Sequence, residues 1–305
     1  MPEIQTTRIT IYPAAPFNFE STAYSHGWSV LAPNAWDKER QALRRVHRLE
    51  QGHVVLLDIQ GSASSEAPEI HVAVHHAEAL SPILQSQIRN DVVQMFRVEE
   101  DLSEFYALCN QRGGQWERLT AGLGRLLRSS SFFEDVVKTI LTTNIQWGGT
   151  KRMVEALITA FGEPYLGDEN LRAFPAPEAI AAVSAESFAE AVRLGYRGPY
   201  IHHLARQVVS GDLQLEALSA SDLPTSELKK ELLAIKGVGP YAAATLLMLL
   251  GRYDELAVDT EFRKFVSEKY FQGEWPGQQK AMSVYEDWER WKYLAFWFDI
   301  YESDG

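Results

Sequence analysis

Residues 225–266 decide the fold, and they read TSELKKELLAIKGVGPYAAATLLMLLGRYDELAVDTEFRKFV. The spacing of apolar residues predicts one helix that ends near Ile235 and a second over Pro240–Leu250 that stops at Gly251. Gly237-Val238-Gly239 leaves so short a turn between them that glycine backbone freedom is needed. The proline that opens the second helix suits its first turn, so the stretch predicts two helices joined by a tight hairpin.

The hairpin has the chemistry of a phosphate-binding site. Gly237 and Gly239 have no side chains to keep a phosphate away from the main chain, and Lys236 adds a cation beside Val238. The start of the second helix offers free N–H groups and the positive end of the helix dipole. Because glycines between helices more often form an ordinary tight turn, the prediction depends on the longer pattern Leu-x-x-Ile-x-Gly-Val-Gly-Pro-x-x-Ala.

An aspartate, Asp259, lies twenty residues past Gly239. It follows the apolar Leu256-Ala257-Val258 and precedes a predicted helix, Thr260–Tyr270, where Asp is a common N-cap. We expect the helix dipole to hold this carboxylate ionised. A fixed anion of this kind also stabilises the oxocarbenium character that develops on a sugar when an N-glycosidic bond breaks.

The charge balance counts against a nucleic-acid partner. The net charge is −12, and residues 121–305 alone carry 19 basic against 26 acidic side chains. Because non-specific DNA affinity comes mostly from Lys and Arg, any contact with DNA must use backbone amides and a few placed cations. The acidity also keeps open an enzyme that cleaves free nucleosides or another small N-glycoside.

Cysteine content and hydropathy exclude several classes of protein. Cys109 is the single cysteine, so neither an intramolecular disulfide nor a four-cysteine iron–sulfur cluster can be built. We expect no signal peptide, because the first residues are polar, and no run of about 18 apolar residues occurs. We therefore expect a cytoplasmic protein that requires no cofactor and has no membrane association.

The first part of the chain predicts strands. Thr7–Tyr12, His53–Ile59 and Ile70–His75 are short, rich in β-branched residues and bounded by turn residues. Helical spacing follows in two segments within residues 81–111. We therefore predict an N-terminal α+β domain over residues 1–120, with a small antiparallel sheet and helices.

From residue 132 onward the pattern is helical. Before the hairpin, helices are expected over residues 133–141, 152–161, 177–183, 187–194 and 200–210. We predict a mostly α-helical domain over residues 121–305, divided into two subdomains, with the hairpin at 225–251. The predicted fold class is α+β.

The hairpin and the following aspartate together resemble the helix-hairpin-helix, Gly/Pro-rich loop, Asp (HhH-GPD) superfamily of DNA glycosylases. The resemblance covers roughly residues 120–305. Residues 133–144 (FEDVVKTILTTN) and 194–200 (LGYRGPY) look like the 8-oxoguanine branch, and residues 288–301 (WERWKYLAFWFDIY) look like bacterial 3-methyladenine DNA glycosylase II. The resemblance implies an N-terminal sheet domain, base flipping and damaged double-stranded DNA as partner, and a monomer fits that mechanism.

The resemblance also implies roles for individual residues. Asp259 matches the catalytic carboxylate, and Asn144 matches an asparagine that fills the gap left by the flipped base. Tyr196 and Arg197 match a loop that contacts the opposite strand. Backbone carbonyls in the hairpin match the ligands of a monovalent cation, Na⁺ or K⁺, that bridges to a DNA phosphate; they belong to Leu233, Ile235 and Val238.

Two departures from the family pattern bear on the chemistry. Tyr241 stands where bifunctional 8-oxoguanine enzymes have a lysine, so no Schiff base can form there and the enzyme is expected to lack lyase activity. Gly149 stands where a second arginine would grip an opposite cytosine. Tyr241 and Trp297 are expected to wall the base pocket, which favours positively charged, alkylated purines through stacking and cation–π attraction.

The sequence therefore predicts a monofunctional glycosylase of alkylated purines in base-excision repair, associated with the nucleoid through DNA. One alternative substrate class is oxidised or deaminated purines, which the Asn144 region favours. Another alternative is a helix-hairpin-helix DNA-binding protein without catalysis, because phosphate binding does not need Asp259. For Trp297, plain core packing is weighed equally with a place in the pocket.

Overall fold

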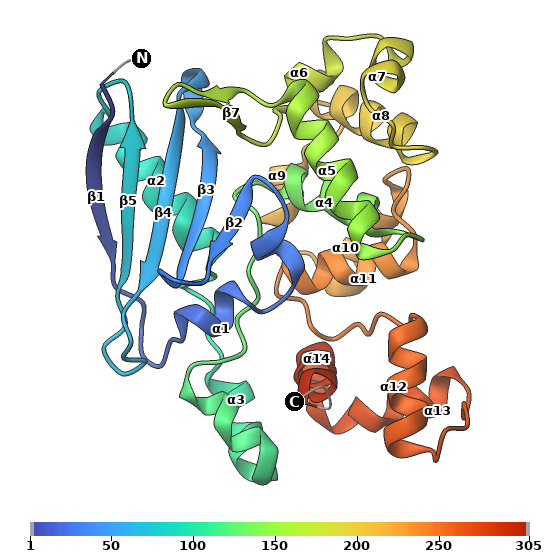
Figure 1. The fold of residues 1–305 in the computed structure, drawn as a ribbon. Helices are drawn as coiled ribbons and strands as arrows, with labels where there is room; N and C mark the ends of the chain where they lie inside the picture. The colour runs from blue at the N-terminus through green and yellow to red at the C-terminus, as the bar shows by residue number, and fades with distance from the viewer. Residues whose placement is uncertain (1–2, 303–305) are drawn as a thin grey trace. The chain divides into compact units, whose positions relative to one another are not determined.

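The computed structural model describes residues 3–302, and it divides the chain into two compact units, residues 1–216 and 217–305. Figure 1 shows an antiparallel sheet formed by the N-terminal part of the chain, followed by helices. The predicted α+β class is confirmed. No helix in the described residues is long and apolar enough to cross a membrane.

The sheet of the first unit has five antiparallel strands in the order β1-β5-β4-β3-β2 (Figure 1). The strands are β1 (Gln5–Ile11), β2 (Asn34–Asp37), β3 (Ala42–Arg48), β4 (Val54–Gly61) and β5 (Ile70–His76). β5 alternates between buried Ile70, Val72 and Val74 and more exposed neighbours, which gives one face to the core. Helix α2 (Pro82–Met95) lies behind the sheet.

Strand β3 was missed in the sequence because its buried positions include polar residues. Its sequence is ALRRVHR, and Arg45 and His47 are both almost fully buried. A period-2 pattern of apolar residues therefore fails to mark the inner face of this strand. The two buried polar side chains belong to an ion-pair network that determines how the first unit packs.

Helical elements complete the first unit. They are α1 (Phe19–Ala23), α3 (Ser103–Arg112), α4 (Phe132–Thr142), α5 (Trp147–Phe161), α6 (Pro177–Ala181), α7 (Ala185–Ala191) and α8 (Arg197–Ser210), with a short hairpin of β6 (Pro164–Tyr165) and β7 (Asp168–Arg172). Helix α9 (Leu215–Ser219) crosses the division between the two units. Ser131 caps α4 by accepting a hydrogen bond from the Glu134 amide at 3.2 Å. Helix α4 is buried along almost its whole length.

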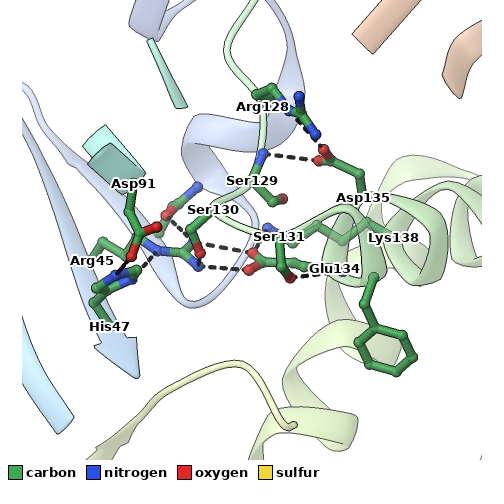
Figure 2. Close-up of polar contacts among 12 residues, drawn as sticks. Arg45, His47, Asp91, Arg128, Ser129, Ser130, Ser131, Glu134, Asp135 and Lys138 are labelled. Carbon is green, nitrogen blue, oxygen red and sulfur yellow. Dashed lines mark hydrogen bonds and ion pairs between the residues drawn. The ribbon is translucent and has the colours of Figure 1, made fainter. Parts of the chain in front are cut away.

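A buried ion-pair network joins β3 to α4 (Figure 2). Both guanidinium Nη atoms of Arg45 donate to the Glu134 carboxylate, at 3.1 and 2.6 Å. Lys138 Nζ lies 2.7 Å from the same carboxylate, and all three side chains are at most 2% exposed. Asp135 accepts hydrogen bonds from Trp28 Nε1 at 3.0 Å and from Arg128 Nε at 3.4 Å. The sheet and the first helices therefore pack as one body.

The boundary predicted at residue 120 marks a change in secondary structure, whereas the contacts divide the chain at 216/217. The reason is the network on β3 and α4, which continues the core of the sheet into the helices. Packing, rather than the change from strands to helices, separates the units.

The second unit carries the hairpin. Its helices are α10 (Thr225–Ala234), α11 (Pro240–Leu249), α12 (Thr260–Tyr270), α13 (Gln278–Met282) and α14 (Lys292–Glu302). A 3₁₀ segment, η4 (Ser283–Trp291), precedes α14. The bounds predicted for α12 are confirmed, and those for α10 and α11 differ by one residue at their C-terminal ends.

Candidate functional site

The hairpin turn has a backbone that glycine makes possible at one position. Gly237 has a φ of 92°, in the left-handed region that favours glycine, and the Val238 amide then donates to the Ile235 carbonyl at 3.0 Å. Gly239 is the N-cap of α11, and no side chain caps that helix. The first amides of α11 therefore remain available to an outside acceptor, which is the arrangement that binds a phosphate.

Gly239 is not needed for the turn itself. Its φ is −92°, which any residue adopts, and a Cβ built at this position meets no atom within 4 Å. The expectation that this turn needs glycine backbone freedom is therefore wrong for position 239. The open space beside Gly239 still lets a ligand approach the main chain, so the expected approach of a phosphate stays a prediction.

The C-terminus of α11 turns the chain into the segment that carries the aspartate. Gly251 has a φ of 79°, and its amide donates to the Met248 carbonyl at 3.0 Å. The Arg252 amide donates to the Leu247 carbonyl at 2.9 Å, which completes a Schellman motif. The predicted role of Gly251 as helix stop is confirmed.

Three contacts fasten this segment to α10 and the residues before it. Lys229 Nζ lies 2.7 Å from Glu255 Oε2, and Thr225 Oγ1 donates to Asp254 Oδ1 at 2.9 Å. Arg252 Nη2 donates to the Ser221 carbonyl at 3.1 Å. The hairpin and the approach to Asp259 are thereby held in one rigid arrangement. These partners lie more than 25 residues apart in the chain, so no spacing rule could have found them.

Asp259 is the N-cap of α12, as predicted. Its Oδ1 accepts a hydrogen bond from the Phe262 amide at 2.7 Å, and the side chain is partly buried. Burial raises the pKa of the carboxyl above its ordinary value, although the hydrogen bond from Phe262 opposes this shift. Desolvation therefore opposes the effect of the helix dipole, and the expectation that the dipole holds the carboxylate ionised stays a prediction.

Tyr241 lies close enough to Asp259 for the two groups to affect each other. The pKa of the Tyr241 hydroxyl is raised by burial and by the negative charge of Asp259. The Tyr241 side chain remains 38% exposed, on the first turn of α11. The structure thus brings together the predicted carboxylate and one predicted pocket aromatic.

Trp297 lies on α14 and is partly buried. Its ring stacks on Tyr293 with centroids 6.2 Å apart, so it has a packing role whatever else it does. Its place in a base pocket stays a prediction.

Asn144 and Tyr196 meet in the first unit. Asn144 is exposed, has a φ of 48°, and its Nδ2 lies 3.3 Å from Tyr196 Oη. The Tyr196 ring is 52% exposed, and its hydroxyl also lies 3.4 Å from Thr143 Oγ1. Asn144 therefore projects from the end of α4 in a backbone conformation that few non-glycine residues adopt.

Arg197 contacts both Tyr196 and the Thr143 backbone next to Asn144. It is 5% exposed, its guanidinium lies 4.4 Å from the Tyr196 ring centroid, and Nη2 donates to the Thr143 carbonyl. A direct contact of Arg197 with DNA stays a prediction; the observed contacts position the Thr143–Asn144 corner. Thr143 itself was missed because a threonine at a helix end has no distinctive sequence signal.

The backbone carbonyls proposed as cation ligands are suited to binding a monovalent cation. In the described part of the chain, the Leu233 and Val238 carbonyls accept no backbone hydrogen bond outside the regular helices, and the Ile235 carbonyl accepts one, from the Val238 amide. Neutral carbonyl oxygens are ligands for hard cations, so the residues fit the predicted ion. Among residues 3–302, no group of three or more His, Cys, Asp or Glu side chains could hold another metal.

Comparisons with known proteins agree with this geometry. A family model described as HhH-GPD superfamily base excision DNA repair protein matches residues 137–291. The DNA-3-methyladenine glycosylase of Bacillus subtilis (strain 168) is 22% identical over 221 residues, which cover 70% of this chain and 71% of that protein.

Two solved structures share the fold over nearly the whole chain. A 3-methyladenine DNA-glycosylase from Archaeoglobus fulgidus has a TM-score of 0.75 at 20% identity, covering 97% of this chain and 98% of its own. The 8-oxoguanine glycosylase/lyase of Clostridium acetobutylicum, in complex with double-stranded DNA containing cytosine opposite 8-oxoguanine, has a TM-score of 0.66 at 18% identity, covering 100% and 97%. The fold therefore accommodates glycosylases of both kinds.

Proposed function

Because the chain belongs to the HhH-GPD superfamily of base excision DNA repair proteins, we propose that it is a DNA glycosylase that removes alkylated purines without cutting the strand. Asp259 carries this proposal. Phe262 fixes one carboxylate oxygen, and the other has no hydrogen bond to a neighbouring side chain in the described residues. A fixed anion of raised pKa suits the stabilisation of a developing cation.

The reaction proceeds on a nucleotide turned out of the helix, because the glycosidic bond cannot be reached inside the stack. The C1′–N bond breaks, its electron pair stays with the base, and the sugar takes oxocarbenium character beside Asp259. Water then adds its oxygen to C1′ and gives up a proton. A purine methylated on a ring nitrogen already carries a positive charge, so it leaves as a neutral base and no acid is needed to protonate it.

Tyr241 supports both the substrate and the absence of lyase activity. A phenol on the first turn of α11 cannot form a Schiff base with C1′, so no covalent intermediate arises at this position. Its exposed ring offers a face on which a cationic base can stack. Trp297 is proposed as a second aromatic wall.

DNA is proposed to bind through its backbone. The uncapped amides of α11 suit the binding of one phosphate. Lys236 would add positive charge beside it, as would a monovalent cation held by the carbonyls of Leu233, Ile235 and Val238. Asn144 and Tyr196 are proposed to occupy the space left by the flipped base. The Asn144–Tyr196 contact also favours a second candidate substrate, an oxidised or deaminated purine, because the 8-oxoguanine branch uses this region.

Base release from a panel of lesions tests the proposal. Duplexes containing 3-methyladenine, 7-methylguanine or 8-oxoguanine are incubated with the protein, with and without alkali to break abasic sites. We expect release of a methylated purine, strand breaks only after alkali, and no protein–DNA adduct trapped by borohydride. Release of 8-oxoguanine alone would select the second candidate, and release of no base from any duplex would reject the glycosylase.

A further inference from the structure

Several cations of the second unit form ion pairs with acidic partners. Lys229 pairs with Glu255, Lys269 with Asp299 and Lys292 with Glu286, each at 2.7 Å. In a chain of net charge −12 this pairing is expected. A cation of the same unit that contacts an aromatic ring and has no carboxylate partner in the described residues keeps its charge available for an anion.

Arg263 is such a cation. It is exposed on α12, and among the described residues no carboxylate forms an ion pair with it. Its guanidinium instead lies 5.4 Å from the ring centroid of Trp275, which is itself 38% exposed. The aromatic face restrains the guanidinium while the N–H groups at its edge remain free to donate.

The position of Arg263 relative to Asp259 indicates what the restrained guanidinium can bind. Asp259 is the N-cap of α12, and the Arg263 amide donates to the Asp259 carbonyl at 3.1 Å. The two residues therefore lie one turn apart at the start of α12, about 5.4 Å along the helix axis. A DNA duplex advances about 3.4 Å along its own axis per nucleotide, so a group one turn from Asp259 is within about two nucleotides of the sugar that Asp259 faces.

We propose that Arg263, oriented by Trp275, binds a backbone phosphate of the DNA strand next to the nucleotide whose sugar faces Asp259. This inference rests on the proposed function and adds a contact that is independent of the hairpin. The planar guanidinium presents paired N–H donors that match two phosphate oxygens. Its attraction for the strand also offsets locally the repulsion between DNA and an acidic protein.

The test measures binding to a short fluorescent duplex containing a tetrahydrofuran abasic analogue, over a series of salt concentrations. The variants are Arg263→Gln, Arg263→Lys, Trp275→Leu and the Arg263→Gln/Trp275→Leu double variant. Arg8→Gln is the matched control, because Arg8 is an exposed arginine on β1 with no ion pair in the described residues. All five variants are checked for folding by circular dichroism.

Arg263→Gln is expected to raise the Kd about tenfold and to lower the slope of log Kd against log salt by about 0.9, the value for one phosphate. Arg263→Lys keeps the charge, so its slope should stay near that of the wild type while affinity falls. Trp275→Leu should weaken binding in the wild-type background but add nothing once Arg263 is removed. Arg8→Gln should leave both Kd and slope unchanged.

An unchanged slope for Arg263→Gln, in a wild type that binds the duplex and releases bases, would overturn the phosphate contact alone. Equal losses from Trp275→Leu in both backgrounds would overturn the role given to the ring. A wild type that neither binds the duplex nor releases a base would overturn the proposed function as well, so the two failures are distinguishable.

Discussion

At the scale of single residues, Asp259 is proposed to serve catalysis at the expense of stability. Burial raises the pKa of its carboxyl in the folded state, so folding is favoured at pH values below the unfolded pKa and loses that contribution as pH rises through the folded pKa. At neutral pH the ionised carboxylate is therefore less favourable in the folded protein than a neutral side chain of the same shape. A group of this kind suits the proposed chemical role better than a role in packing.

Asp259→Asn is accordingly expected to raise the free energy of unfolding at pH 7, by up to about 1 kcal/mol, because Asn still caps α12. The difference from the wild type should shrink as the pH falls towards 3, where the carboxyl is protonated. Urea unfolding at the two pH values measures both effects. A variant less stable than the wild type at pH 7 would mean that Asp259 acts as a cap alone.

Gly239 allows phosphate approach to be separated from folding. Because its φ is −92° and a Cβ meets no atom within 4 Å, Gly239→Ala should leave stability unchanged or raise it by about 0.5 kcal/mol. Binding to duplex DNA should nevertheless weaken, because the new methyl group occupies the path of a phosphate. Gly237→Ala is the contrasting control, since its φ of 92° makes Ala costly in the free protein. Unchanged DNA affinity in Gly239→Ala would remove the hairpin as the contact.

At the scale of elements, the segment between α11 and α12 depends on its attachment to α10. Removing the Lys229–Glu255 pair, which spans 2.7 Å, should loosen the approach to Asp259 and slow base release about tenfold. Lys229→Ala tests this, and Lys230→Ala is the matched control on the same helix, without an ion pair in the described residues. A double variant that also lacks Glu255 should be no slower than Lys229→Ala. Equal rates for Lys229→Ala and Lys230→Ala would contradict the positioning role.

The hairpin elements could be read from sequence because their signals are local. Glycines, a proline, a capping aspartate and helical spacing all lie within residues 225–266, and the observed helices agree within one residue. Strand β3 could not be predicted from the sequence, because its inner face contains Arg45 and His47, whose partners lie far along the chain. A buried charge that is neutralised by a residue far along the chain leaves no periodic pattern in the sequence.

The same distinction applies to the site. Asp259 as an N-cap was predicted. Asn144 and Tyr196 were each assigned a DNA contact through family resemblance, but their contact with each other was not predicted. The direction in which the pKa of Asp259 shifts was not predicted, because desolvation depends on packing that a linear pattern does not contain. The burial of Arg197 beneath Tyr196 was missed for the same reason.

At the scale of the whole molecule, the stability of the first unit depends on Glu134. Burial raises the pKa of this carboxyl, but the charges of Arg45 and Lys138 outweigh burial and lower it to about 2. A lowered folded pKa contributes stability above the unfolded pKa, about 4.3, and that contribution is lost as the pH falls towards 2. The protein should therefore lose stability over this acidic range.

Glu134→Gln leaves two buried cations without a counter-charge, so it should lower the free energy of unfolding by about 3–5 kcal/mol at pH 7. Glu163→Gln is the control, because Glu163 pairs with Arg48 at 2.9 Å where both side chains are about one-third exposed. Exposed pairs contribute about 1 kcal/mol or less. Urea unfolding compares the variants, and a Glu134→Gln loss no larger than that of Glu163→Gln would contradict the role of the network.

The central claim is that Asp259 stabilises the cation formed as a damaged purine leaves DNA, and single-turnover base release from a methylated duplex tests it most directly. Wild type and Asp259→Asn are compared at protein concentrations that saturate the duplex, with binding measured in parallel. We predict release of methylated purine by the wild type, loss of at least about a thousandfold in rate for Asp259→Asn, and equal binding by both. Equal rates of release by the two proteins would contradict the claim.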